Sequence, residues 1–293
     1  MAWDQISITV PHEFVEPISH VFERYGHGVG IQSLNKLDAE ITTFLPSGSD
    51  SRLARIEIGV NLAKSITPMG DLQISPLDNE TDWRNAWKDH FSVLHITDRI
   101  VIKPSWIDYV ANESELIIEI DPGFAFGTGY HPTTHSCLAL LETHITQGAE
   151  ILDLGTGSGI LSIAAAKLGA ANVLGLDIDP LCVKAANNNA KTCGVTSITQ
   201  FVTGSLPSEK IHHNNYDCVV ANISSRIGIE KSVDILEVLK PSGILILSGI
   251  INNQALSTIN HFESIAIVEN HYWKDDWVTF LIRKQETQDE NNE

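Results

Sequence analysis

The sequence contains no stretch that approaches the ~18 uninterrupted apolar residues of a membrane-spanning helix. Its first residues lack a basic segment followed by an apolar run, so we expect no secretory signal peptide. Only four cysteines are present, and no two of them form a Cys-x-x-Cys pair. Cys182, Cys193 and Cys218 fall in or beside expected core elements, which favours buried free thiols over metal ligands. The sequence therefore predicts a cytoplasmic protein without a metal site or a membrane anchor.

Basic residues are also scarce. The chain has 19 Lys and Arg against 37 Asp and Glu, which gives a formal net charge of −18. Direct binding to nucleic acid needs clustered cations that displace phosphate counterions, so this charge argues against it. A basic protein partner is compatible with the charge because electrostatic attraction favours its encounter with an acidic surface. Solubility alone would also account for an acidic surface.

The 293 residues suffice for two domains. Residues 1–77 show the pattern of a small α+β domain, with a helix opened by Pro11 and a second helix near residues 51–62. Strands are expected around these helices, at 4–9, 29–34, 39–45 and 72–74. This strand–helix–strand–strand–helix–strand order is that of a ferredoxin-like split βαβ sandwich. The segment carries no chemical motif, which favours a recognition or docking domain.

A linker helix is expected at 78–92, where Trp83 and Trp87 share one face. From residue 93 to 284, strands are expected first near 100–103 and 116–120, and strands and helices then alternate, with one helix at 225–239. This alternation predicts a parallel sheet covered by helices on both faces. Two final strands, at 265–269 and 277–283, are expected to form an antiparallel pair at one edge. We expect the acidic tail, 285–293, to be disordered.

One glycine-rich turn stands out in the second domain. An apolar strand, 151–154, leads into Gly155, Gly157 and Gly159, and a small-residue helix follows. Glycines in such a turn let the backbone lie against a ligand without a Cβ in the way. Asp177 ends the next strand, where a carboxylate is expected to meet the hydroxyls of a ribose.

The spacing differs from the dinucleotide pattern G-x-G-x-x-G, because here the glycines follow Asp153 as G-x-G-x-G. A nucleoside with a cationic amino-acid tail suits an acidic turn better than a pyrophosphate does. The sequence therefore predicts S-adenosylmethionine as the ligand, with Asp153, Gly155, Gly157 and Asp177 as contacts. The alternative is a glycine-rich turn in an unrelated α/β domain.

Two further segments are expected beside this turn, because ligands of open α/β sheets lie beyond the carboxyl ends of the strands. The segment 121–135 is rich in glycine and reads as a flap; Thr128 and either Thr133 or Thr134 in it are candidate contacts to the cofactor. His131 in the same segment is a candidate contact to the substrate. Asn222 follows an apolar strand, where its amide is able to accept from an incoming amine and donate to the cofactor.

Taken together, these residues resemble the PrmA-type ribosomal protein methyltransferases, which modify protein eleven of the large ribosomal subunit. The resemblance covers nearly the whole chain. Its most specific motifs are Asp121-Pro-Gly-Phe-Ala-Phe-Gly-Thr-Gly-Tyr-His-Pro-Thr-Thr134, Leu152-Asp-Leu-Gly-Thr-Gly-Ser-Gly-Ile160, Gly175-Leu-Asp-Ile-Asp-Pro180 and Ala221-Asn-Ile223. One departure is Ser224-Ser225, where many relatives continue Asn-Ile-Leu-Ala.

The resemblance implies a ferredoxin-like substrate-binding domain, a connecting helix and a seven-stranded class I, Rossmann-like, S-adenosylmethionine-dependent methyltransferase domain. Carried over by motif, Thr134, Gly155, Asp177 and Asn222 correspond to the cofactor contacts. The implied reaction is successive methylation of lysine ε-amines and of an N-terminal α-amine. The implied partner is a basic ribosomal protein, and we expect the enzyme to be a monomer.

The expected chemistry is direct displacement at the cofactor methyl group by a neutral lysine amine that Asn222 positions. One alternative is a related lysine methyltransferase with another protein target. Glutamine or adenine methylation is less favoured, because the strand end reads Asn222-Ile-Ser-Ser and not Asn-Pro-Pro-Tyr. A regulatory protein that binds the cofactor without methyl transfer is the remaining alternative, which the intact flap motif disfavours.

Overall fold

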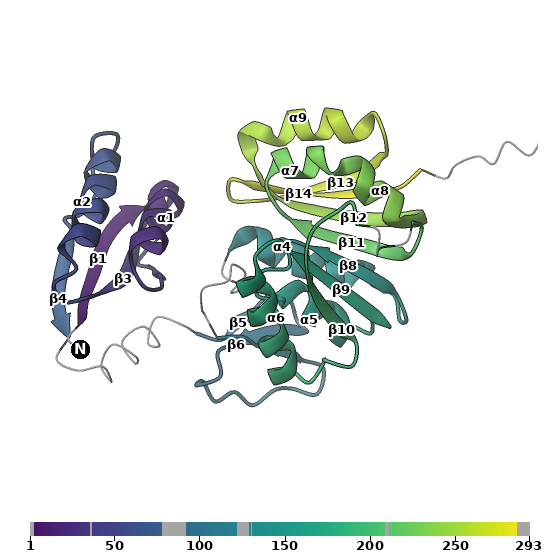
Figure 1. The fold of residues 1–293 in the computed structure, drawn as a ribbon, viewed down its shortest axis with the longest axis horizontal. Coiled ribbons are helices and arrows are strands. Elements are labelled where there is room, and N and C mark those ends of the chain that lie inside the picture. The colour runs from purple at the N-terminus through teal and green to yellow at the C-terminus, as the bar shows by residue number, and fades with distance from the viewer. Residues whose placement is uncertain are drawn as a thin grey trace, which may run out of the picture. The chain divides into compact units, whose positions relative to one another are not determined.

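The computed structural model describes residues 3–35, 37–77, 92–121, 129, 131–208, 211 and 213–285. The chain divides into two compact units, Met1–Ser92 and Val93–Glu293 (Figure 1). Apart from their end residues, the expected linker helix at 78–92 and the expected tail at 285–293 lie outside the described residues.

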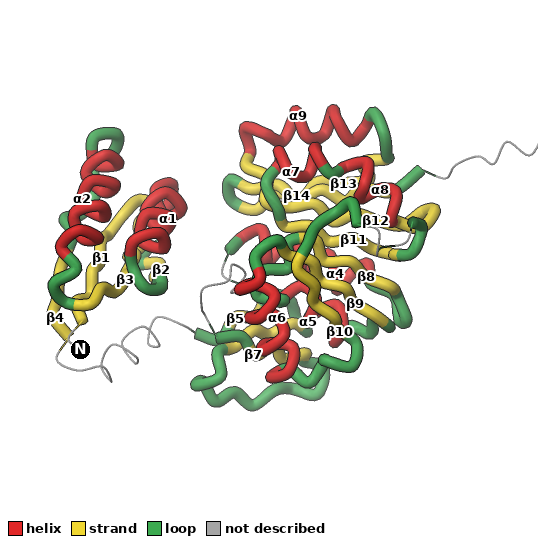
Figure 2. The backbone as a smooth tube through the Cα atoms, in the orientation of Figure 1, coloured by secondary structure: helices red, strands yellow, loops and turns green. Residues whose placement is uncertain are grey.

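The first unit is a four-stranded antiparallel sheet with two helices packed on one face (Figure 2). Its elements are β1 (Trp3–Pro11), a 3₁₀ turn (His12–Phe14), α1 (Val15–Tyr25), β2 (Gly30–Ser33), β3 (Asp38–Pro46), α2 (Asp50–Lys64) and β4 (Gln73–Leu77). The order in the sheet is β2-β3-β1-β4. Alternate residues of β1, such as Ile6 and Ile8, meet Phe22 of α1 and Ile56 of α2 in one core.

The second unit contains the larger sheet. Its elements are β5 (Leu94–His95), β6 (Ile100–Lys103), β7 (Leu116–Glu119), α4 (Pro132–His144), β8 (Glu150–Leu154), α5 (Ile160–Lys167), β9 (Asn172–Asp177), α6 (Pro180–Thr192), β10 (Thr199–Thr203), β11 (Tyr216–Asn222), α7 (Ser225–Glu230), α8 (Ser232–Val238), β12 (Leu239–Ile251), α9 (Asn252–Glu263), β13 (Ile267–Lys274) and β14 (Trp277–Arg283).

Seven strands of this unit form one sheet in the order β10-β9-β8-β11-β12-β14-β13. The five strands from β10 to β12 pair in parallel, whereas β14 is antiparallel to both β12 and β13. The expected parallel sheet with an antiparallel pair at one edge is confirmed. Because the parallel strands all end at the same edge, the segments that follow β8, β9 and β11 gather there.

Helices cover both faces of this sheet (Figure 1), and residue alternation in the strands supplies a core to each face. On β8, Ile151 packs in the core with α4, α5 and α6, while Leu152 packs in the core with α8 and α9. On β11, Val220 packs in the same core as Ile151, and Val219 packs in the same core as Leu152. The strands are therefore buried on both faces, as parallel strands usually are.

The structure adds one feature and differs from expectation in two places. The strands at 100–103 and 116–119, whose sheet the sequence did not specify, belong to a separate three-stranded sheet, β5-β6-β7. The single helix expected at 225–239 is two helices, because Lys231 adopts φ −95° and ψ 3°, outside the helical region. Cys182 and Cys193 are free but only partly buried, whereas Cys218 is buried as expected.

None of the helices among the described residues is long and apolar enough to cross a membrane. The described His, Cys, Asp and Glu side chains form no group of three or more suited to a metal ion.

Candidate active site

The glycine turn between β8 and α5 is tightly packed. Gly155, Gly157 and Gly159 have φ values of +79°, +54° and +81°, in the left-handed region that favours glycine. A Cβ on Gly155 would lie 2.8 Å from Cγ2 of Ile223, and one on Gly159 would lie 2.9 Å from Cβ of Ala186. Backbone conformation and space therefore both require glycine here.

The buried carboxylate of Asp153 holds this turn by hydrogen bonds. Its Oδ2 accepts hydrogen bonds from Thr156 Oγ1 (2.7 Å), Ser162 N (3.1 Å) and Ser162 Oγ (2.7 Å). The side chain is fully buried, and burial raises the pKa of Asp153 to about 6 although these donors oppose the shift. Within the described part of the chain, its second oxygen, Oδ1, has no hydrogen-bond partner. One half of the carboxylate thus holds the turn, and the other half suits a cationic group.

Asp177 joins the turn to the end of β9. Its Oδ2 accepts from Gly157 N at 2.9 Å, and its Oδ1 accepts from Asp179 N at 3.0 Å. The side chain of Asp179 instead caps α6, since its Oδ1 accepts from Leu181 N at 2.8 Å. Of the two acidic residues after β9, Asp177 is therefore the one in contact with the glycine turn.

Thr134 and Asn222 come together at this edge of the sheet. Asn222 ends β11, and its Nδ2 donates to Oγ1 of Thr134 in the first turn of α4 at 3.4 Å. Thr134 is buried, whereas Asn222 is half-buried. Ser225, part of the departure from the family pattern, has its hydroxyl 2.7 Å from that of Thr258 in α9. Ser225 thus packs toward α9, and the Asn222–Thr134 contact is kept.

His131 is the N-cap of α4. Its Nδ1 accepts from Thr133 N at 3.3 Å and lies 2.7 Å from Thr133 Oγ1, and its ring packs edge-to-face on Trp277 at 4.8 Å. Burial lowers the pKa of His131 to about 4, so the imidazole is neutral near pH 7. The capping contact was not foreseen, and a contact to the substrate stays a prediction. Thr128 lies outside the described residues.

The depressed pKa of His131 makes a prediction for stability. The unfolded histidine binds a proton below pH ~6.5, but the folded one does so only below about pH 4. The stability that neutral His131 provides is therefore complete above pH ~6.5 and is lost as the pH falls toward 4, by up to ~3 kcal/mol. His131→Asn keeps a capping acceptor and removes this titration.

Denaturant unfolding of both proteins from pH 4 to 7 measures the effect. The gap in stability between wild type and His131→Asn should shift against wild type as the pH falls. A gap that does not change with pH would show that His131 is not buried in its neutral form.

Sequence reasoning missed several neighbours of this site. Ile178, beside Asp177, is 78% exposed although apolar. Gly204, just after β10, donates its N–H to Asp177 O at 2.8 Å, which brings the end of β10 to the same edge. Separately from these neighbours, Asp121 accepts from Ser105 N and Ser105 Oγ at 2.7 and 2.8 Å, which links the start of the flap motif to the loop after β6. Of these features, Ile178 alone left a signal in the sequence, as an apolar residue directly after the acidic strand end.

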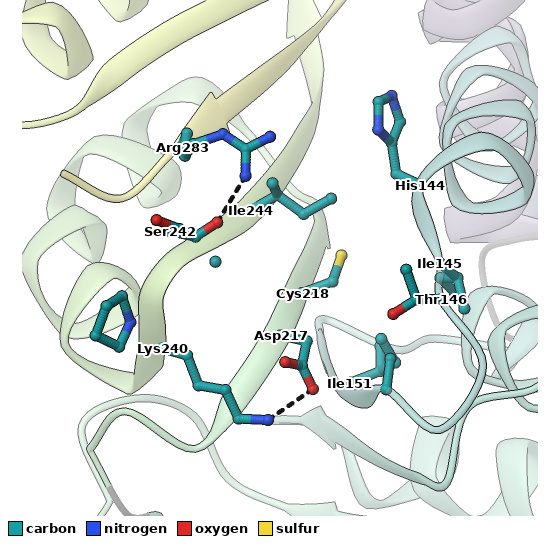
Figure 3. Close-up of a pocket in the computed structure, with 13 residues that line it drawn as sticks. His144, Ile145, Thr146, Ile151, Asp217, Cys218, Lys240, Ser242, Ile244 and Arg283 are labelled. Carbon is teal, nitrogen blue, oxygen red and sulfur yellow. Dashed lines mark hydrogen bonds and ion pairs between the residues drawn. The ribbon is translucent and has the colours of Figure 1, made fainter. Parts of the chain in front are cut away.

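A cavity of about 240 Å³ lies at the opposite edge, around the amino halves of β8, β11 and β12 (Figure 3). Its charged side chains already have protein partners. Lys240 pairs with Asp217 at 2.8 Å, and Arg283 donates to Ser242 O at 2.7 Å and pairs with Glu269. None of the candidate residues lines this cavity, so we place the active site at the carboxyl edge.

Comparison with known proteins identifies the family. A family model described as ribosomal protein L11 methyltransferase (PrmA) matches residues 2–285. The ribosomal protein L11 methyltransferase of Herpetosiphon aurantiacus is 36% identical, over 97% of this chain and 99% of the relative. This chain belongs to the ribosomal protein L11 methyltransferase family. The Chloroflexus aurantiacus protein of that name is 35% identical, over 97% of this chain and 98% of the relative.

A solved structure agrees with this family. Ribosomal protein L11 methylase from Lactobacillus delbrueckii subsp. bulgaricus superposes with a TM-score of 0.62 at 30% identity. The match covers 67% of this chain and 100% of that one. The chain is therefore an S-adenosylmethionine-dependent methyltransferase with the Rossmann-like fold of that class.

The carboxyl edge fits this cofactor. Gly155, the partly exposed glycine of the turn, lies at this edge, and Asp177 supplies acceptors at the end of the neighbouring strand. Oδ1 of Asp153, buried without a partner among the described residues, suits the positive charge of the cofactor's amino-acid end. The donor set is polar and free of thiols, which matches a nucleoside with an amino-acid tail.

Proposed function

We propose that this enzyme methylates the lysine ε-amino groups and the N-terminal α-amino group of ribosomal protein L11. The observation that carries the proposal is the contact between Asn222 and Thr134, which puts an amide and a hydroxyl beside the glycine turn. A carboxamide at this position is able to orient an amine next to a bound nucleoside. The names of the relatives supply the identity of the protein substrate.

Four side chains are proposed to hold the cofactor. Each oxygen of Asp177 accepts one protein N–H and keeps a second lone pair for a ribose hydroxyl. The Thr134 hydroxyl and the free oxygen of Asp153 are suited to the amino-acid end. Ile178, exposed beside Asp177, offers an apolar cover for the base.

S-adenosylmethionine supplies a methyl group on a positively charged sulfur. Asn222 donates to Thr134 through Nδ2, which leaves Oδ1 to accept a hydrogen bond from the incoming amine. That contact aims the nitrogen lone pair, and such orientation removes a large entropic barrier. The amine must be neutral to react, and apolar surroundings lower its pKa. A pKa of about 4 makes His131 a poor general base at neutral pH, so we propose a substrate contact for it.

The charge of the enzyme supports a basic protein partner. A net charge of −18 attracts a basic ribosomal protein at long range and repels nucleic acid. Such steering predicts that added salt slows the encounter. A cytoplasmic enzyme would meet ribosomal proteins where they are made.

Labelled S-adenosylmethionine tests the proposal directly. The enzyme is incubated with total ribosomal proteins, and the labelled band is identified and mapped by peptide mass. Label on lysines and on the N-terminus of L11 is the expected result. Label on a different protein would favour the alternative of a related lysine methyltransferase. The absence of any label, while cofactor binding persists, would favour a regulatory protein.

The first unit is proposed to select the protein substrate. The chain divides between Ser92 and Val93, and every described candidate cofactor residue lies in the second unit. A shortened chain that starts at Val93 should therefore bind S-adenosylmethionine as the full chain does, yet fail to methylate L11. Calorimetry with the cofactor serves as the control for folding of the shortened chain. Methylation of L11 at the full rate by that chain would refute the division of roles.

A further inference from the structure

Ile223, the residue directly after Asn222, lies between glycines from two neighbouring strands. Its Cγ2 atom leaves no room for a Cβ on Gly155, at the end of β8, since the two would be 2.8 Å apart. A Cβ on Gly249, in β12, would lie 2.4 Å from the carbonyl oxygen of Ile223 and 2.8 Å from its carbonyl carbon. β11 runs between β8 and β12 in the sheet, so these contacts approach Ile223 from both sides.

The contact with Gly249 belongs to an irregular part of β12. The pairing of β12 with β14 shifts register between Leu247 and Ile250, and Gly249 inside this shift has φ +83°. Ile223 N donates to Ser248 O at 3.0 Å. Bulges of this kind commonly redirect a neighbouring side chain next to an active site. The bulge in β12 thus holds the backbone of Ile223 by one hydrogen bond, and the space between Gly249 and Ile223 is too small for a Cβ.

The packing of Ile223 against Gly155 links the turn assigned to the cofactor with the residue assigned to the amine substrate. Gly155 opens the turn assigned to the cofactor, and Ile223 follows the amide assigned to the amine. The side chain of Ile223 therefore spaces the turn from the end of β11. Methyl transfer depends steeply on such spacing, because a shift of ~1 Å in a reacting group costs about 10²-fold in rate.

We propose that Ile223 is a positioning residue for methyl transfer, and that its Cγ2 sets the distance between the glycine turn and Asn222. The proposal rests on the proposed function of Asn222 and of the turn. It assigns a role to the γ-methyl group of an apolar side chain, which has no atom that forms an ion pair or a hydrogen bond. It also explains why glycine is needed at Gly155 and at Gly249 on opposite sides of one residue.

Two substitutions at Ile223 separate the γ-methyl from general packing. Ile223→Val removes only the δ-methyl and keeps Cγ2, so single-turnover methyl transfer should stay within about twofold of wild type. Ile223→Ala removes Cγ2 together with Cγ1 and Cδ1, so the single-turnover rate should fall about tenfold while the Kd for S-adenosylmethionine is unchanged. Equal rates for Ile223→Ala and Ile223→Val would overturn the proposal, as would a loss confined to cofactor affinity.

Adding a methyl group on the other side of the contact completes the test. Gly155→Ala places a Cβ against Cγ2, and its rate loss should be partly reversed in Gly155→Ala/Ile223→Ala but not in Gly155→Ala/Ile223→Val. Gly148→Ala, with φ +83° and no atom near its Cβ, is the control for backbone strain alone. Rate losses that simply multiply in the double variants would overturn the proposal.

The same measurements distinguish a failure of the proposed function from a failure of the proposed role of Ile223. Wild type that labels no L11 contradicts the proposed function, whatever the variants do. Wild type that labels L11, with Ile223→Ala as active as wild type, contradicts the role of Ile223 alone. The ratio of variant to wild-type rates is taken on whichever protein the wild type labels, so the second result does not depend on the first.

Discussion

Asp177→Ala should weaken the binding of S-adenosylmethionine by about two to four powers of ten. A hydrogen bond to a charged group contributes about 1.5–3 kcal/mol, and a ribose offers two hydroxyls to this carboxylate. The substitution also frees Gly157 N, whose hydrogen bond to Asp177 Oδ2 holds the glycine turn. Isothermal titration calorimetry with the cofactor measures the loss.

Asp179→Ala is the matched control for Asp177→Ala. It removes the same charge two residues away but breaks only the cap of α6, at Leu181 N. That loss should reduce stability by ~1 kcal/mol and leave cofactor affinity nearly unchanged. If Asp177→Ala binds the cofactor as wild type does, the ribose contact is assigned to the wrong residue.

Asn222→Ala should lower single-turnover methyl transfer by about one to three powers of ten, as expected for an oriented hydrogen bond at a reacting centre. The contact with the amine is made chiefly in the transition state, so the rate falls without an equal loss of substrate binding. The melting temperature should change little, because Asn222 is half-buried and its bond to Thr134 is long, at 3.4 Å. Rapid-quench assays at saturating cofactor give the rate.

Asn172→Ala controls for the loss of an asparagine from this sheet. Asn172 begins β9 and bonds Glu150 at the opposite edge, so its removal should not affect the rate. Near wild-type transfer by Asn222→Ala would make Asn222 an ordinary turn residue. A large drop in melting temperature would instead make it a structural one.

Gly155, Asp177 and Asn222 could be predicted as candidate site residues because each ends or follows a recognisable strand. Gly155 and Asp177 occupy positions where a parallel sheet binds ligands, whatever the rest of the fold does. Asp179 caps α6 in the structure, whereas in the sequence an Asp before Pro suits both a cap and a ligand contact. The sequence indicated His131 as a candidate contact to the substrate, but local patterns do not reveal that Trp277 packs on its ring.

Other features depended on context that local patterns lack. The helix expected at 225–239 has a continuous apolar periodicity, yet Lys231 interrupts it. The strand at 100–103 has the composition of a core strand, and only its pairing with β7 and β5 places it in a small separate sheet. Strand pairing follows from contacts between distant segments, and strand propensity does not specify the partner.

The sequence by itself determined the class of fold, the glycine turn and the acidic strand end, because these depend on local periodicity and on backbone freedom at a few glycines. The tertiary structure decided which side chains meet. Thr134 and Asn222 are 88 residues apart, and they touch because β11 lies between β8 and β12 under the start of α4. The same strand order places Ile223 between Gly155 and Gly249. Contacts of this kind are fixed by the packing of whole elements, so they follow from the assembled sheet and not from any one segment.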